Sequence, residues 1–285
     1  MLINPRPLPL PGLLLRGRQR ERPSPSARTV LPSEYGTDLR IWYDADDRSA
    51  VTVDGSGNVT QLADKSGNGL HAVQIGTEPL PVVAPDVSPT GCALVHFKIQ
   101  SGSLGCLGLT GATALHSFFG LLKPCTFACY VEFPTSDTGV LWDIANPASA
   151  STANRYQVIA NDSSNMGSRV IRNAMNQNSK TCWGRDGTGL ALVVRYDGAT
   201  LKFASRDGGV VNDEEGSVAE ATNISGLSAL TFSGQRAIGS PPGNRAQFYL
   251  GEFFALSRAL TDDEMRAARE SLWARWNNTW TREQP

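Results

Sequence analysis

The sequence predicts an all-β fold, an antiparallel β-sandwich with a C-terminal capping helix and an extended N-terminal arm. From Leu39 onward, short runs of β-forming residues alternate with clusters of Gly, Asn, Asp, Ser and Pro, which is typical of strands joined by turns. No segment alternates strand and helix in the way that a parallel sheet requires. The 285 residues, 40% hydrophobic and 19% charged, are enough for one domain with a large core.

The first segment, residues 1–36, differs from the rest in composition. Proline alternates with leucine, and arginines then follow at every second position, which on an extended chain point to one side. Proline lacks the backbone donor and fixes φ, so the segment cannot continue a helix or enter a sheet interior. The sequence therefore predicts an extended docking arm over 1–36 and the sandwich over 37–285. The arginines expected to grip an acidic groove on a neighbouring protein are Arg16, Arg18, Arg20 and Arg22.

The strands of the sandwich are predicted from β-forming runs bounded by turn residues. Two turns have the composition of hairpins: DGSGN at 54–58 and the Asp197-Gly198 pair. Two segments rich in Pro, Gly, Ser and acidic residues, 77–91 and 209–227, are predicted to be surface loops. The predicted strands are 39–45, 50–54, 58–64, 93–98, 125–133, 139–145, 155–161, 168–173, 190–198, 200–208, 235–240 and 247–260.

A helix is predicted over 262–276. Thr261 and Glu264 have the spacing of a capping box, and Leu260 and Met265 have that of a hydrophobic staple. Apolar residues at spacings of three and four form one face, which we expect to pack on the sandwich. That face consists of Met265, Ala268, Leu272 and Trp276.

The dense turn at Asp64–Gly69 is predicted to be a structural corner. Asp64 and Asn68 have side chains that bond nearby backbone groups, and Gly67 and Gly69 accept positive φ.

Two stretches carry a resemblance to a known family. IWYDADDRSAVTVDGSGNVTQLADKSGNGLHAVQ at 41–74 and LGEFFALSRALTDDEMRAARESLWARW at 250–276 are similar to the opening and closing segments of the concanavalin A-like lectin/glucanase superfamily. Within that superfamily, they resemble the laminin-G-like jelly-roll variety that is common in bacteriophage proteins. The resemblance spans about 38–278, and between the two ends the strands are compatible without a motif. The resemblance implies a jelly-roll sandwich that binds glycans, hydrolyses them or serves as a structural part of a virion.

Charge and cysteine content narrow the choice of partners. A net charge of −1 gives no overall field for nucleic acid or an anionic membrane, and no apolar run has the length of about 20 residues that a membrane span needs. The arginines follow the first apolar run, the reverse of an export signal. Five cysteines without CxxC pairs fit neither a disulfide framework nor a zinc site.

No pattern in the sequence supports an enzymatic activity. Glycoside hydrolysis needs two carboxylates that face one bond, whereas the run 213–215 is contiguous within a predicted loop and Asp143 stands alone. The three histidines occur without a GxSxG elbow. We therefore predict a protein that is not an enzyme and that needs no cofactor.

Two kinds of binding site remain open. Calcium would use carboxylates near strand ends, for which the candidates are Asp44, Asp46, Asp47 and Asp64. Glycan binding would use an exposed aromatic platform, although aromatic residues in sandwiches more often fill the core. The residues expected to contact a glycan are Trp183 and Tyr156.

The sequence favours a non-enzymatic structural protein of a phage virion, a capsid decoration or a tail or collar appendage held by its arm. Its partners would be other virion proteins within a homotrimer or other symmetric oligomer, and it would be assembled in the host cytoplasm. The alternative is a glycan-binding module for attachment to the host surface.

Overall fold

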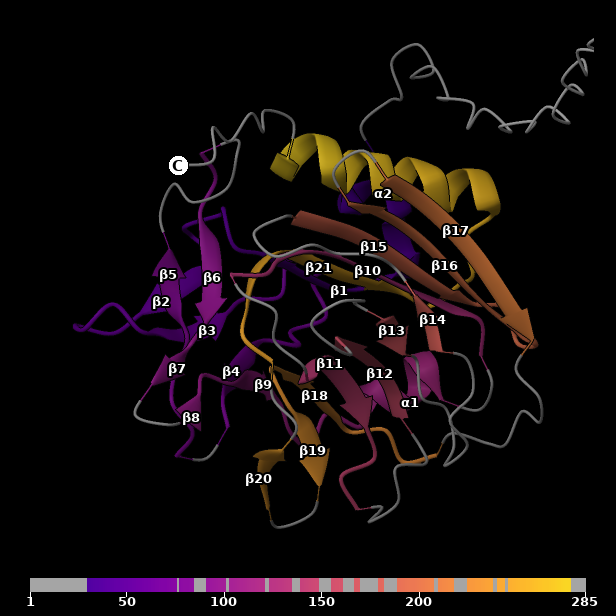
Figure 1. The fold of residues 1–285 in the computed structure, drawn as a ribbon. Coiled ribbons are helices and arrows are strands. Elements are labelled where there is room, and N and C mark those ends of the chain that lie inside the picture. The colour runs from indigo at the N-terminus through magenta and orange to yellow at the C-terminus, as the bar shows by residue number, and fades with distance from the viewer. Residues whose placement is uncertain are drawn as a thin grey trace, which may run out of the picture.

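Two antiparallel sheets pack face to face in the computed structural model, and helix α2 lies across the outer side of the larger sheet (Figure 1). The predicted all-β sandwich is therefore confirmed. The predicted arm lies largely outside the described residues. The structure describes residues 30–75, 77–84, 91–100, 103–120, 123–134, 139–148, 155–160, 167–169, 179–181, 189–207, 210–217, 225–237, 240–243 and 246–277.

The larger sheet has eight strands in the order β17-β16-β15-β10-β21-β6-β5, with β1 also paired to β21. β21 lies near the middle because its first part pairs with β6, its second part with β1 and most of its length with β10. The strands are β1 (Leu39–Asp44), β5 (Val82–Ala84), β6 (Leu94–Phe97), β10 (Cys125–Glu132), β15 (Gly189–Tyr196), β16 (Thr200–Asp207), β17 (Val210–Ser217) and β21 (Phe248–Leu256).

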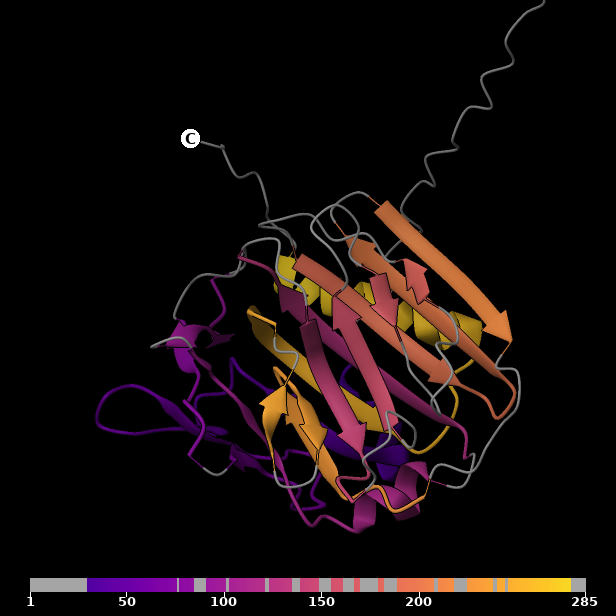
Figure 2. The ribbon, with the colours of Figure 1, turned by 60° about the horizontal axis from the view of Figure 1, so that its bottom comes forward.

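The second sheet has seven strands in the order β12-β11-β18-β9-β4-β3-β2. Figure 2 shows β11 and β12 on the side of the sandwich opposite to α2. Its strands are β2 (Val51–Val53), β3 (Val59–Leu62), β4 (Ala72–Gln74), β9 (Leu107–Leu109), β11 (Gly139–Ala145), β12 (Arg155–Ala160) and β18 (Ala229–Phe232). Three two-stranded sheets complete the described strands: β7 (Ile99–Gln100) with β8 (Ser103–Leu104), β13 (Gly167–Arg169) with β14 (Ser179–Thr181), and β19 (Gln235–Ala237) with β20 (Ser240–Gly243).

The hydrophobic core fills the space between the two sheets. Side chains alternate across a strand, so every second residue of each sheet points inward. Trp142 meets Phe253 edge to face, with 5.6 Å between ring centroids, and Phe127 packs against Trp142 at 5.0 Å. Tyr43 and Phe232 make a further edge contact at 5.7 Å. Aromatic contacts of this kind add to the free energy of burial.

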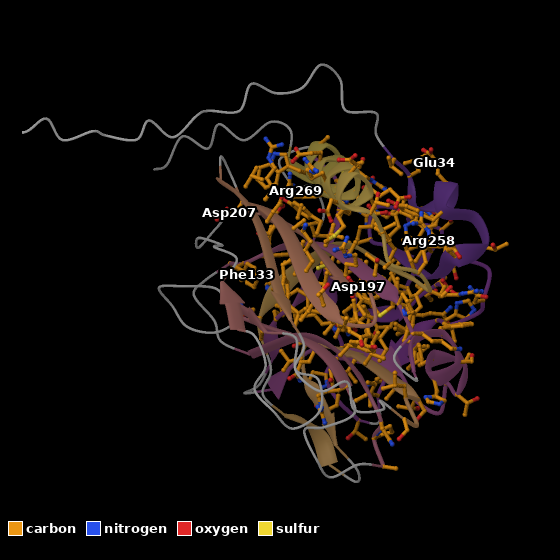
Figure 3. All side chains as sticks on the ribbon, turned by 90° about the vertical axis from the view of Figure 1, so that its right-hand side faces the viewer. Glu34, Phe133, Asp197, Asp207, Arg258 and Arg269 are labelled. Atoms are coloured by element: carbon orange, nitrogen blue, oxygen red, sulfur yellow. The ribbon has the colours of Figure 1, made fainter. Side chains whose placement is uncertain are left out.

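Helix α2 (Asp262–Asn277) confirms the predicted C-terminal helix. The capping box is formed, because the Glu264 carboxylate accepts the Thr261 backbone N–H at 2.7 Å and Thr261 Oγ1 accepts the Glu264 N–H at 3.3 Å. Arg258 donates two hydrogen bonds to Glu264 and so stabilises the N-terminal end of the helix. Figure 3 labels Arg258. The four residues of the predicted apolar face are buried.

Two short helices were not predicted. The 3₁₀ helix η1 (Pro32–Asp38) lies within and just after the predicted arm and packs on β1 and β21. The α-helix α1 (Ala114–Phe119) follows β9. Both are too short to show a repeated apolar face, which is why periodicity did not reveal them.

The two predicted hairpins are confirmed, with β2 paired to β3 and β15 paired to β16. The prediction of a loop over 209–227 is wrong in its first part, where β17 pairs with β16 along its whole length. The loop predicted over 77–91 likewise contains strand β5. Both lie at the ends of the strand order of the larger sheet, and edge strands tolerate charged residues and proline nearby.

Among the described residues, no helix is both long and apolar enough to cross a membrane.

Candidate functional site

A row of side chains crosses the outer face of the seven-stranded sheet. Strand register places Gln157 opposite Asp143, Asp143 opposite Thr231, and Thr231 opposite Gly108. Their neighbours in sequence, among them Trp142 and Tyr156, point into the core. Since side chains alternate between the faces of a strand, these polar residues all lie on the face away from the core. The row continues through Val73, Gln61 and Thr52.

A buried ion pair holds one end of this face. Arg155 donates from Nη1 to Asp143 Oδ2 at 3.1 Å, and the two side chains are 2% and 0% exposed. Arg155 lies two residues before Gln157 on β12 and therefore shares its face. A buried ion pair contributes little net stability compared with an apolar pair, but it is costly to break once formed. A stabilising role alone is thus a weak explanation for this pair.

Gln157 is the unusual residue of the site. Its side chain is 0% exposed, and neither the amide oxygen nor the amide nitrogen has a hydrogen-bond partner within the described part of the chain. An unsatisfied buried polar group costs about 1–3 kcal/mol, so each such group calls for a specific explanation. Thr231 differs, because its hydroxyl donates to the Gly234 carbonyl at 2.7 Å.

A turn with unusual backbone geometry lies at the end of β18. Ser233 has φ of 60°, a left-handed conformation that is uncommon for any residue but glycine. Its N–H donates to the Leu141 carbonyl at 2.9 Å and its hydroxyl to the Ala246 carbonyl at 2.8 Å. These bonds hold the conformation and direct the chain into the β19–β20 hairpin, which packs beside β11. Sparsely populated backbone conformations often occur near functional sites.

The other end of the row is open to solvent. Val73 is 41% exposed and Thr52 is exposed, in contrast to the buried polar end. Gly108 separates the two halves, and a Cβ there would meet Ile75 Cδ1 at 2.7 Å. The face therefore combines a buried polar end with a more exposed end that carries Val73, Gln61 and Thr52.

The residues predicted to contact a glycan are not in this row. Tyr156 is 1% exposed, its ring packs against Phe127 at 5.3 Å, and its hydroxyl donates to the Phe119 carbonyl at 3.1 Å. It is a core residue and offers no exposed ring to a sugar. Trp183 lies outside the described residues, as do the arm residues Arg16, Arg18, Arg20 and Arg22.

The predicted corner turn is confirmed. The Asp64 carboxylate accepts the backbone N–H groups of Trp42, Ser66 and Leu70 at 2.9–3.0 Å. The Asn68 amide donates to the Leu39 and Arg40 carbonyls, and Gly67 and Gly69 have φ of 87° and 70°. His71 Nδ1 accepts the Asp64 N–H at 3.0 Å.

The other three aspartates considered for calcium also engage protein groups. Asp44 accepts from Lys65 at 2.9 Å and from Arg275 at 2.9 and 3.0 Å, Asp47 accepts from Lys65 at 2.7 Å, and Asp46 accepts the Ala93 N–H at 3.0 Å. Lys65 donates hydrogen bonds that lower the pKa of Asp47 to about 2. Within the described ranges, no three His, Cys, Asp or Glu side chains are grouped to hold a metal ion.

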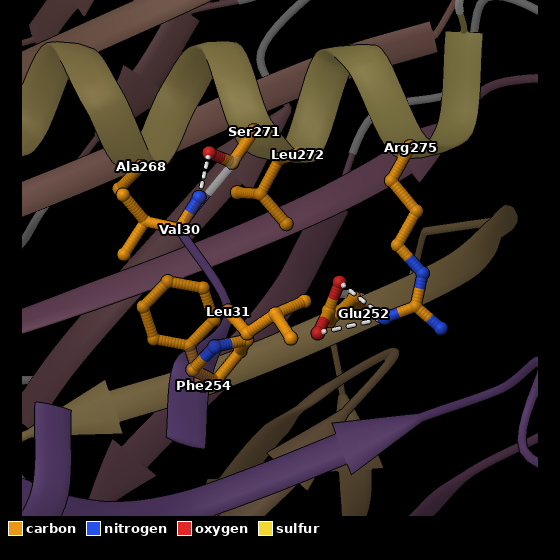
Figure 4. Close-up of a pocket in the computed structure, with 9 residues that line it drawn as sticks. Val30, Leu31, Glu252, Phe254, Ala268, Ser271, Leu272 and Arg275 are labelled. Atoms are coloured by element: carbon orange, nitrogen blue, oxygen red, sulfur yellow. Dashed lines mark hydrogen bonds and ion pairs between the residues drawn. The ribbon is translucent and has the colours of Figure 1, made fainter. Parts of the chain in front are cut away.

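A second polar cluster lies between α2 and the larger sheet. Glu252 accepts from the indole nitrogens of Trp42 at 2.8 Å and Trp276 at 3.1 Å, and Arg275 bridges Glu252 to Asp44. Figure 4 shows Arg275 facing Glu252 beside a small pocket, where Val30 donates to Ser271 Oγ at 2.7 Å. Burial raises the pKa of Glu252 above its ordinary value. This cluster connects α2 to β1 and β21, and its groups satisfy one another, so it has a structural role.

The local sequence pattern indicates part of the site at Asp143, Arg155 and Gln157. In RYQV at 155–158, polar and aromatic or apolar residues alternate, which places Arg155 and Gln157 on one face of a strand. Asp143 is an isolated carboxylate in the sequence. The pairing of β11 with β12, which brings these residues together, depends on strand register and not on local sequence.

Comparisons with known proteins give structural similarity only. No protein-family model matches the chain, and no curated protein matches it. An arabinofuranosidase complexed with arabinofuranosyl-alpha-1,2-xylobiose has a TM-score of 0.54 at 14% identity, over 76% of this chain and 51% of that one. A structure titled for the dependence of botulinum neurotoxin type C cell entry on two ganglioside molecules has a TM-score of 0.54 at 10% identity, over 84% and 52%. The binding domain of botulinum neurotoxin serotype D/C has a TM-score of 0.52 at 9% identity, over 82% and 52%.

These similarities correct the prediction that the protein is not an enzyme. That prediction is contradicted, because an arabinofuranosidase is among the structures that share the fold. The physical reason is that a fold does not determine activity, and enzymes and binding domains occur on the same sandwich. The chain spans about half the length of these solved structures. What they show for this chain is its fold, an antiparallel β-sandwich.

Proposed function

We propose that this domain is a glycan-binding module whose ligand is held at Asp143, Arg155 and Gln157, on the outer face of the seven-stranded sheet. The observation that carries the proposal is the Gln157 amide, which is buried beside an ion pair and lacks a hydrogen-bond partner within the described part of the chain. A ligand that supplies the missing hydrogen bonds explains the presence of a buried polar residue at this position.

The chemistry of the side chains supports a carbohydrate. Sugar hydroxyls both donate and accept hydrogen bonds, and a carboxylate, a guanidinium group and an amide together offer both kinds of partner. Structures that share the fold add support, since one is an arabinofuranosidase in complex with an arabinofuranosyl-xylobiose and another concerns a neurotoxin whose cell entry depends on two ganglioside molecules.

Burial of the site has a kinetic consequence. Because Gln157 is 0% exposed without ligand, a ligand reaches it only after part of the covering chain moves. Association that requires a conformational change is slower than the typical range of about 10⁵–10⁷ M⁻¹s⁻¹. We therefore expect a slow association rate for a ligand that binds at Gln157, and not for one that binds nonspecifically at the surface.

The test compares two glutamines on the same sheet face. The full chain is screened on a glycan array, and the strongest ligand is titrated by calorimetry against Gln157→Leu and Gln61→Leu. Gln61 lies in the same cross-strand row but on β3, at the half-buried end. Gln157→Leu should lose binding and keep or gain stability, by up to about 1–3 kcal/mol, because an unsatisfied amide is removed. Gln61→Leu should bind normally.

Two results would contradict the proposal. Absence of binding to every glycan on the array would refute the function. Equal binding by the wild type and Gln157→Leu would refute the site. Release of reducing ends, measured in the same samples, reports whether a bound glycan is also cleaved.

The virion role stays a prediction that the comparisons do not support. Attachment through residues 1–36, assembly into a homotrimer or other symmetric oligomer, and incorporation into particles all belong to it. Mass spectrometry of particles purified on a density gradient tests it: peptides at stoichiometric level are expected, and their absence from particles would refute it.

A further inference from the structure

The Gln157 amide restricts what kind of sugar can satisfy it. A carboxamide presents one acceptor oxygen and two N–H donors side by side in a plane. Both atoms lack partners within the described residues, so a fitting ligand must provide a donor and an acceptor together. Two hydroxyl groups on adjacent carbons do this, since one donates to Oε1 while the other accepts from Nε2.

The charges around Gln157 further restrict the ligand. Asp143 and Arg155 carry opposite charges and are ion-paired at 3.1 Å, so together they contribute no net charge. Thr231 and Gly108, the next members of the row, are neutral. An anionic sugar would bring to this buried position a charge that no described residue of the row compensates, which is strongly unfavourable.

We infer that the site takes a neutral sugar unit that presents two adjacent free hydroxyl groups to Gln157, and that it rejects sialic and uronic acids; this inference rests on the proposed function. It selects between the two kinds of glycan named for the structures that share the fold, because an arabinofuranosyl-xylobiose is neutral whereas a ganglioside carries sialic acid. The neutral class is the one expected here.

The experiment measures the affinity of the full chain for matched probes. The probes are neutral pentose and hexose oligosaccharides, the same neutral oligosaccharides after mild periodate oxidation, and a ganglioside oligosaccharide with and without its sialic acid. Periodate cleaves the bond between carbons that bear adjacent hydroxyls and so removes the recognised group. Neutral oligosaccharides should bind, periodate should abolish binding, and sialic acid should not improve it.

A charge variant tests the role of the amide. Gln157→Glu keeps the side-chain length but replaces the donor by an acceptor, and it should weaken binding by about tenfold or more through loss of a hydrogen bond and a new buried charge. Gln61→Glu is the matched control and should bind as the wild type does. Thermal unfolding of both variants separates loss of binding from loss of folding.

The outcomes distinguish a failure of this inference from a failure of the proposed glycan-binding function. Stronger binding of the sialylated oligosaccharide, or binding that survives periodate, would overturn the inference and leave glycan binding in place. Failure of every probe and every arrayed glycan would overturn both. Full binding by a folded Gln157→Glu protein would overturn the role of the amide.

Discussion

His96 on β6 shows how burial alone changes the chemistry of a side chain. Its imidazole stacks on Tyr249 with 4.0 Å between ring centroids, and its Nε2 atom is buried without a hydrogen-bond partner in the described residues. Burial, with a smaller contribution from Lys98, lowers the pKa of His96 to about 4. The folded protein therefore holds this histidine in its neutral form.

This lowered pKa makes the stability depend on pH in one direction. An unfolded chain binds the proton at about pH 6.5, so the stabilising contribution is complete above that pH and is lost as the pH falls toward 4. His96→Phe keeps the ring stack and removes the titration. Urea unfolding at pH 7.5 and pH 4.5 should show a larger fall in unfolding free energy for the wild type than for the variant. Equal falls in the two proteins would contradict the assignment.

Asp143 and Gln157 show that a substitution at a buried polar residue can either lower or raise the stability of the fold. Asp143 is bonded to Arg155, so removing the partner leaves a buried charge. Gln157 has no partner in the described chain to lose, so replacing it removes a cost. Binding function and stability are thus expected to change in opposite directions at position 157, a common trade-off at functional sites.

At the scale of elements, α2 is held to the larger sheet by charge as well as by apolar packing. Arg275 is the only described residue that bridges Asp44 on β1 and Glu252 on β21, both of which are buried. Arg269, labelled on the same helix in Figure 3, forms an ion pair with Asp213 on the edge strand β17. Asp213 belongs to the acidic run that the sequence placed in a loop.

Arg275→Met should be strongly destabilising. It removes the cation that Asp44 and Glu252 share, while Asp44 keeps its ion pair with Lys65. Breaking a buried ion pair from one side costs about 3–5 kcal/mol. Arg266→Met is the control, because Arg266 lies on the same helix with an exposed i,i+3 partner and should change stability by about 0.5 kcal/mol or less. Chemical denaturation measures the unfolding free energy of both variants. A loss of less than about 1 kcal/mol for Arg275→Met, no more than an exposed ion pair contributes, would show that the bridge is dispensable.

The contact between β21 and α2 leaves no space for an extra carbon at Gly251. A Cβ there would lie 2.9 Å from Trp276 and 3.0 Å from Tyr130. Gly251 also lies where the register of β10 and β21 shifts. We expect Gly251→Ala to push Trp276 away and to cost about 1–3 kcal/mol, the usual range for overpacking.

Gly55→Ala is the matched control, because nothing lies within 4 Å of a Cβ at Gly55. The melting temperature and the tryptophan fluorescence of the two variants give the measurement. An unchanged spectrum and an unchanged melting temperature for Gly251→Ala would mean that the helix shifts without cost.

At the scale of the whole molecule, the described chain begins on one side of the sandwich and the candidate site lies on the other. Val30 is bonded to Ser271 of α2, over the outer face of the eight-stranded sheet. Gln157 and Asp143 lie on the outer face of the seven-stranded sheet, and Figure 1 shows strands β11 and β12 of that sheet on the side of the sandwich away from α2. A partner bound at Val30, where the described chain begins, would therefore leave the candidate site free.

This arrangement predicts that attachment through the N-terminus preserves ligand binding. Protein biotinylated at its N-terminus and immobilised should bind the array-selected glycan with the same Kd as protein in solution. Protein immobilised through a cysteine introduced at exposed Thr52, at the open end of the site row, is the comparison and should bind less ligand. Loss of binding on N-terminal immobilisation alone would contradict the opposite placement of the two faces.

Several features of the fold could be predicted from sequence because they depend on residues close together in the chain. The capping box at Thr261 and Glu264 and the Asp197-Gly198 turn are local signals, and both form as expected. The corner at Asp64–Gly69 is local in the same sense. The strand β17 was missed because an edge strand lacks the alternation that burial on one face imposes on a central strand.

The sequence by itself thus determined the fold class, the C-terminal helix and the turns, since backbone sterics and hydrophobic periodicity act over a few residues. Only the tertiary structure decided which polar residues meet. Asp143, Arg155 and Gln157 come together through the register of β11 and β12, and that register depends on packing against the whole core. Tyr156, expected at a binding surface, lies in that core because the same alternation turned Gln157 outward. Burial and the satisfaction of hydrogen bonds are properties of the assembled sandwich, so the residue that most strongly indicates a ligand could not be distinguished in the sequence from an ordinary strand glutamine.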